Sequence, residues 1–178
     1  MVKHHEPLQF FLEKAICQIL YVRKVYPQDI FQAENYYGVP VHYPNSENLQ
    51  TYITNAVTSV LSLPRDNVNC IVLTLTDELD RPVESFGFNL SPNSHPEIGT
   101  SEAEINCLAQ LLLLDVSSPP AKVSSFVLQV VGDFTVGTDL WRPSTKTSHI
   151  RKPAPSSLKS VYLGNHVCTV IQDCEIVH

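Results

Sequence analysis

The sequence predicts one domain of the α+β class, on the basis of three observations. Three segments carry apolar residues at steps of three and four, which is the period of an amphipathic helix. Other runs are rich in β-branched and aromatic residues, and two of them flank a short polar turn, as in a β-hairpin. The chain has 178 residues, 43% of them hydrophobic and 17% charged, which suits a single sizeable core. Helices segregated against a largely antiparallel sheet form an α+β domain.

Two helices are expected in the N-terminal third of the chain. The apolar positions of residues 8–20 and of residues 49–61 each fall on one stripe of a helix. Proline is expected to bound these helices, because it lacks the N–H group and disfavours helical geometry in the residue before it. The first helix is expected to lie between Pro7 and Pro27. The second is expected to be capped by Asn45 or Ser46 and to end before Pro64.

Extended segments are expected after these helices and between them. Residues 70–76 and 83–90 read as the hairpin, with Phe86 and Phe88 on one face. A short strand at 39–41 and a longer one at 125–131 are also expected, and 35–38 reads as a tyrosine-rich link. The third helix should open on a capping box, in which Ser101 and Glu104 bond each other's backbone N–H groups.

The segment after Asp133 differs from the rest of the chain. Residues 134–158 show no sustained period of apolar residues and contain the one tryptophan, Trp141. A loop of this length in a compact domain tends to be functional or disordered. Two final strands are expected at 160–163 and 167–177. Residues 141–178 hold 5 basic and 2 acidic side chains, against 7 basic and 16 acidic in residues 1–140. Trp141 is interpreted either as a core residue or as a binding anchor.

Motifs for common chemistry are missing from the sequence. It has no phosphate-binding glycine loop, dinucleotide fingerprint, nucleophile elbow or HExxH helix. Ordinary packing explains His166, Cys168 and Cys174 better than a metal site, and a solvated turn explains the acidic residues 77–80 better than a cation site. Five scattered cysteines favour reduced thiols in a nuclear or cytosolic compartment. A net charge of −6 argues against direct nucleic-acid binding, and no membrane span is expected.

Several motifs resemble the HORMA-domain family. The stretch from Ile19 to Val41 resembles the family's first helix and following strand, and the order of later landmarks is similar over most of the chain. Within the family the sequence most resembles the branch of DNA polymerase zeta accessory subunits. The motifs that carry this closer resemblance are Ile30-Phe31-Gln32, Tyr37-Gly38-Val39-Pro40-Val41 and Arg81-Pro82-Val83-Glu84.

The resemblance implies a non-enzymatic adaptor without a cofactor or metal. A HORMA domain would fill residues 1–178, with a core at 1–133 and a C-terminal safety belt at 134–178 that wraps a partner peptide. The implied ligand is a proline-containing peptide of the polymerase zeta catalytic subunit, in translesion DNA synthesis and DNA repair. A translesion scaffold polymerase and an AAA+ ATPase that remodels the belt are further implied partners. The implied location is the nucleus, with the cytoplasm as an additional one.

The resemblance also points to site residues. Tyr52 and Trp141 correspond to aromatic anchors for the peptide, and Thr169 and Ile171 fall where the family has a second partner surface, although neither residue type is kept there. One alternative is a HORMA adaptor of the spindle checkpoint or of the meiotic chromosome axis. An alternative of another class is a small enzyme with a cysteine nucleophile, which needs a histidine brought near by folding.

Overall fold

A computed structural model describes the greater part of the chain. The described residues are 7–64, 68–92, 105–111, 122–132, 149–151, 157–163, 166–172 and 175–177. The predicted capping box at 101–104 lies outside them, as do residues 164–165 between the two final predicted strands.

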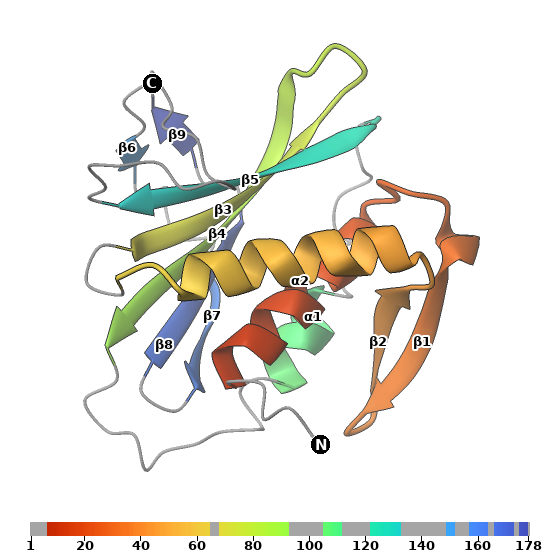
Figure 1. The fold of residues 1–178 in the computed structure, drawn as a ribbon, viewed down its shortest axis with the longest axis horizontal. Coiled ribbons are helices and arrows are strands. Elements are labelled where there is room, and N and C mark those ends of the chain that lie inside the picture. The colour runs from red at the N-terminus through yellow and green to blue at the C-terminus, as the bar shows by residue number, and fades with distance from the viewer. Residues whose placement is uncertain are drawn as a thin grey trace.

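An antiparallel sheet of five strands, in the order β5-β3-β4-β8-β7, forms the centre of the fold. Helix α2 lies across this sheet with α1 and the helical residues 105–111 beside it, and the β1–β2 hairpin lies on the far side of the helices (Figure 1). The predicted α+β class, with three helices on an antiparallel sheet, is confirmed. The elements are α1 (Pro7–Val22), β1 (Phe31–Tyr36), β2 (Val39–Pro44), α2 (Glu47–Leu61), β3 (Val68–Thr76), β4 (Pro82–Pro92), β5 (Ser125–Gly132), β6 (His149–Arg151), β7 (Ser157–Leu163), β8 (His166–Gln172) and β9 (Glu175–Val177).

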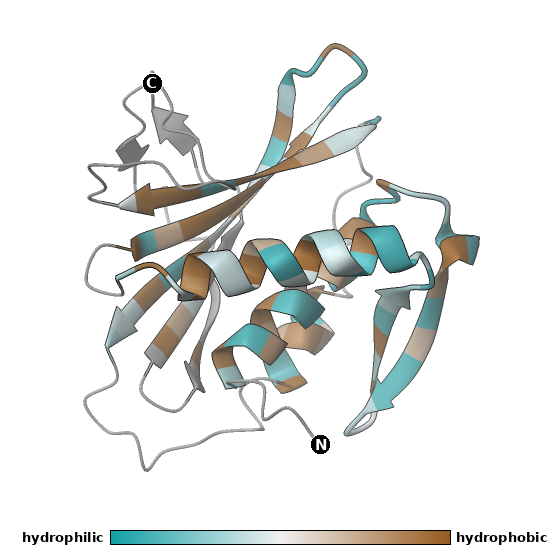
Figure 2. Cartoon of the chain, in the orientation of Figure 1, coloured by the Kyte–Doolittle hydropathy of each residue, from teal (hydrophilic) through white to brown (hydrophobic). Residues whose placement is uncertain are grey.

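The core lies between the helices and the sheet. Phe86 and Phe88 are fully buried on one face of β4, as their spacing predicts. Helix α1 is buried on more than its apolar stripe, because α2 and β2 also pack against it, and even Lys14 and Gln18 are inaccessible. A hydrogen bond offsets part of the cost of burying the polar Gln18 side chain, because its Oε1 accepts a bond of 2.9 Å from the His42 amide. Figure 2 shows the contrast between hydrophobic β3 and the hydrophilic outer strand β1.

Helix α1 ends before the proline that was expected to close it. The Val25 amide bonds the Leu20 carbonyl and the Lys24 amide bonds the Tyr21 carbonyl, which together form a Schellman motif. Lys24 occupies the left-handed position of this motif with a φ of 52°. Glycine is the residue that favours this conformation, since it has no Cβ atom to clash with the backbone.

Replacing Lys24 with glycine is therefore expected to stabilise the protein. Relief of the left-handed strain is worth about 1–2 kcal/mol, and the larger entropy of glycine in the unfolded chain offsets about half of it. Thermal melts should show a higher midpoint for Lys24→Gly than for the parent chain. An unchanged or lowered midpoint would contradict this reading of the helix end.

The predicted link at 35–38 is part of a second hairpin. Residues Phe31 to Tyr36 pair with Val39 to Pro44, so Tyr37 and Gly38 form a two-residue turn. Both turn residues have positive φ, at 48° and 88°, as a type I′ turn requires. The Gly38 amide also donates a hydrogen bond of 2.7 Å to Asn35 Oδ1. Strand β1 was not predicted because its residues are mostly polar and exposed.

Within the described residues, the other predicted elements are confirmed with two changes near the C-terminus. Ser46 caps α2 by accepting a hydrogen bond from the Leu49 amide, and the 70–90 hairpin forms as expected. The expected strand at 167–177 is two strands, β8 and β9, and the region expected to be irregular contains the short strand β6. Strand β6 pairs with β9 rather than with the main sheet.

The acidic residues after β3 form a hairpin turn, as predicted. Asp77 Oδ1 accepts hydrogen bonds from the Leu79 and Arg81 amides, and Asp77 Oδ2 lies 2.7 Å from the Arg81 guanidinium. These bonds, those from Arg81 first, lower the pKa of Asp77 to about 2. Glu78 pairs instead with Lys122. The Asp77 carboxylate therefore stabilises the turn.

Candidate peptide-binding edge

Strand β5 is an end strand of the five-stranded sheet. It pairs with β3 on one side, and no described strand pairs with its other side. An exposed strand edge presents backbone N–H and C=O groups that can take up an added strand from another chain. Val127 of β5 is 47% exposed, so an apolar side chain is accessible on this end strand. This edge is the candidate binding site.

An aromatic cluster lies at the start of this edge. Phe126 of β5 meets Tyr52 of α2 at 5.8 Å between ring centroids and Tyr26 at 6.4 Å, both edge to face. Burial first, and then the nearby Tyr52, raises the pKa of Tyr26, so its phenol stays protonated at neutral pH. Tyr52 itself is 51% exposed. Tyr52 is therefore accessible to a ligand beside the open edge.

The chain crosses from one side of the sheet to the other directly after β5. Strand β5 lies at one end of the strand order and β7, the next strand of this sheet, lies at the opposite end. Four interstrand spacings amount to about 20 Å. The connection 133–156 includes β6, which pairs with β9, and a chain of this length spans up to about 80 Å when fully extended. This connection is thus long enough to pass around an added peptide.

The C-terminal hairpin is tied into the core on the β4 side. Strand β8 pairs with β4 along its length, and Val161, Cys168 and Val170 are buried. Burial, with Cys107 and Cys70 nearby, raises the pKa of the Cys168 thiol well above its usual range. Thr169 and Ile171, predicted as a second partner surface, lie opposite Asn89 and Gly87 of β4. Their suggested role stays a prediction.

An ion pair links α1 to the strand that holds this hairpin. Arg23 Nε and Nη2 donate to the two carboxylate oxygens of Glu84 on β4, both at 2.7 Å. The Arg23 side chain is 1% exposed and that of Glu84 13%. A bidentate pair of this kind restricts the relative orientation of the two side chains in addition to joining opposite charges. It therefore sets the position of α1 relative to β4.

The predicted anchors are only partly visible in this site. Tyr52 lies beside the open edge, and its role as a peptide anchor stays a prediction. Trp141 lies outside the described residues. Phe126 was not singled out from the sequence. Its place at the start of a predicted strand was known, but its contacts with Tyr26 and Tyr52 come from three separate segments.

The described residues offer little for other chemistry. Burial, followed by Glu13, raises the pKa of Cys17 to about 12, and Cys168 is also raised, which is the reverse of an activated nucleophile. No group of three or more His, Cys, Asp or Glu is placed to hold a metal ion in the described part of the chain. None of the described helices has the length and apolarity to cross a membrane.

Comparison with known families agrees with this architecture. The HORMA domain family matches residues 6–113. The chain belongs to the HORMA domain family. The resemblance of its sequence motifs to that family is confirmed.

Relatives of this HORMA chain carry the name mitotic spindle assembly checkpoint protein MAD2B. The Rattus norvegicus protein is 40% identical over 85 residues, which are 47% of this chain and 40% of that protein. The Gallus gallus protein is 37% identical over 106 residues, which are 59% of this chain and 50% of that protein. The matched region thus spans half or less of these relatives.

Two solved structures share the fold at low sequence identity. A chain in the crystal structure of the mitotic checkpoint complex superposes with a TM-score of 0.76 at 22% identity, and covers 96% of this chain and 97% of its own. Caenorhabditis elegans HTP-2 bound to the HIM-3 closure motif gives 0.70 at 10% identity, covering 94% and 88%. These likenesses agree with a HORMA fold.

Proposed function

We propose that this HORMA protein is a non-enzymatic adaptor that traps a partner peptide on the open edge of β5. The observation that carries the proposal is the connection after β5, which leaves the open edge and ends in a hairpin seated on the opposite edge. A peptide added to β5 would gain main-chain hydrogen bonds, and a belt closed over it would slow its release. The segment 134–178 is the proposed belt.

The proposed ligand is a proline-containing peptide of the DNA polymerase zeta catalytic subunit. The motifs at residues 19–41 and 81–84 support this choice, as do the MAD2B relatives. The protein would then serve translesion DNA synthesis and repair in the nucleus. The translesion scaffold polymerase would be a second partner, and an AAA+ ATPase would reopen the belt.

Deleting the belt is expected to abolish peptide binding. A chain that ends at Asp133 has no segment that could close over the ligand. It also lacks β8, which pairs with β4, so the edge of β4 becomes exposed. Calorimetric titration of the polymerase zeta peptide against the full and shortened chains measures the loss, and circular dichroism of the shortened chain verifies that it is folded. Binding by a folded shortened chain with full affinity would contradict the proposal.

A second candidate is an adaptor of the spindle checkpoint or the meiotic chromosome axis. The printed name of the relatives and the closure-motif complex of HTP-2 favour this alternative. Affinity purification of the full chain, followed by mass spectrometry of the bound proteins, separates the two. Recovery of checkpoint or axis proteins without polymerase subunits would replace the first proposal by the second.

A further inference from the structure

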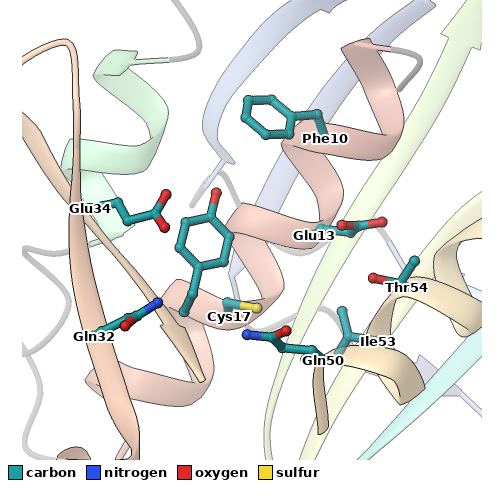
Figure 3. A pocket seen from close by; sticks show the side chains of 9 residues that line it. Phe10, Glu13, Cys17, Gln32, Glu34, Gln50, Ile53 and Thr54 are labelled. Atoms are coloured by element: carbon teal, nitrogen blue, oxygen red, sulfur yellow. The ribbon is translucent and has the colours of Figure 1, made fainter. Parts of the chain in front are cut away.

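A cavity separate from the β5 edge lies between α1, α2 and the β1–β2 hairpin. Its volume is about 290 Å³. Figure 3 shows Phe10, Glu13 and Cys17 of α1 on one wall and Glu34 on the hairpin strand opposite. Pockets that hold drug-sized ligands measure about 300–1,000 Å³. This cavity is at the lower limit of that range, which suits a single side chain better than a larger molecule.

The cavity is acidic. Among the described residues that line it, Glu13 and Glu34 are acidic and none is basic. The field of these carboxylates reaches the buried groups between them, because Glu13 adds to the effect of burial in raising the pKa of Cys17, and Glu34 and Glu13 both add to it for Tyr43. A cationic group placed there would meet two carboxylates, that of half-buried Glu13 and that of exposed Glu34, so the attraction of opposite charges favours its binding.

Neutral groups around the carboxylates can complete the binding of a cation. Gln50 donates its Nε2 to the Pro44 carbonyl, which leaves Gln50 Oε1 as an acceptor, and Thr54 on the next turn supplies a hydroxyl. The Phe10 ring lines the cavity and is 39% exposed. On the hairpin side of α1 the Lys14 ammonium already lies 3.2 Å from the Phe10 ring centroid and 3.0 Å from that of Tyr36. Aromatic rings here thus hold a cation within the protein itself.

We propose that this cavity binds the arginine side chain of a partner protein. The planar guanidinium can bond a carboxylate through two N–H groups and can stack on an aromatic ring, and both kinds of group are present. Gln50 and Thr54 lie two residues on either side of Tyr52, and so on roughly the opposite flank of α2. The arginine site and the β5 edge can therefore be occupied at the same time and by different partners. This inference does not depend on the proposed belt.

Nuclear magnetic resonance titration of the full chain tests the arginine site. The probe is a capped Gly-Gly-Arg-Gly-Gly peptide, and its control has citrulline, which keeps the shape and lacks the charge. The arginine peptide is expected to shift the amide signals of the cavity residues on α1, β1 and α2, with little effect from the citrulline peptide. Equal shifts with both peptides, or shifts only at other acidic surfaces, would overturn the proposal.

Two double variants distinguish binding of the arginine peptide in the cavity from attraction by the general negative charge of the protein. Glu13→Gln with Glu34→Gln should weaken binding of the arginine peptide by about tenfold or more, because both carboxylate partners are lost. Asp29→Asn with Asp80→Asn removes the same charge from exposed positions elsewhere and should change binding by less than about twofold. Thermal melts confirm that each variant is folded. Equal losses in the two double variants would refute a specific site.

Discussion

Replacing Glu84 with alanine is expected to lower the free energy of unfolding by about 3–5 kcal/mol. The Arg23 side chain is 1% exposed, and its guanidinium donates two hydrogen bonds to this carboxylate. Removing Glu84 takes these two charge-assisted hydrogen bonds from a buried cation, which costs far more than an exposed pair contributes. Urea denaturation followed by circular dichroism measures the difference.

Glu78→Ala is the matched control for this substitution. Glu78 also pairs with a cation, but its side chain is 64% exposed and that of Lys122 is 82% exposed. Solvent screens such a pair, so the control should melt close to the parent chain. If Glu84→Ala were no less stable than Glu78→Ala, the link between α1 and β4 would not contribute as described.

Replacing Tyr52 with alanine is expected to weaken peptide binding by about 2–4 kcal/mol, the range of aromatic hot-spot residues. Tyr52 lies beside the open β5 edge and is 51% exposed, so its loss should affect the ligand more than the core. Trp141→Ala is expected to act in the same range, on the resemblance alone. Calorimetric titration with the polymerase zeta peptide measures both, and thermal melts of each variant detect a loss of folding.

Tyr37→Asn provides the control for a lost tyrosine. Tyr37 is 73% exposed at the tip of the β1–β2 hairpin, and asparagine tolerates its positive φ. Peptide affinity should be unchanged in this variant. A folded Tyr52→Ala chain that binds as well as Tyr37→Asn would remove Tyr52 from the site.

Local signals in the sequence were sufficient for much of the fold. The cap at Ser46 and the apolar period of residues 49–61 predicted α2, because both signals act within one or two helical turns. The hairpin at 70–90 followed in the same way from two strands and a polar turn. Strand β1 was missed, since four of its six residues are exposed and its pairing depends on the turn at Tyr37 and Gly38.

Features made by distant segments could not be predicted in this way. Strands β6 and β9 are three residues each, and their pairing places His149 opposite Val177, which is distant from it in the sequence. The aromatic cluster at the β5 edge joins Tyr26, Tyr52 and Phe126 from three elements, and the acidic cavity joins α1, α2 and the β1–β2 hairpin. Tyr52 was singled out only through the resemblance to the HORMA family, whereas Phe126 was recognised only from the fold.

Hydrogen–deuterium exchange of the full chain, with and without the polymerase zeta peptide, tests the central claim most directly. If the peptide adds to the open edge, amides of β5 (Ser125–Gly132) that face this edge gain hydrogen-bond partners, and their exchange should slow by about tenfold or more. Peptide binding that leaves exchange in β5 unchanged and slows it only elsewhere would contradict the proposed site.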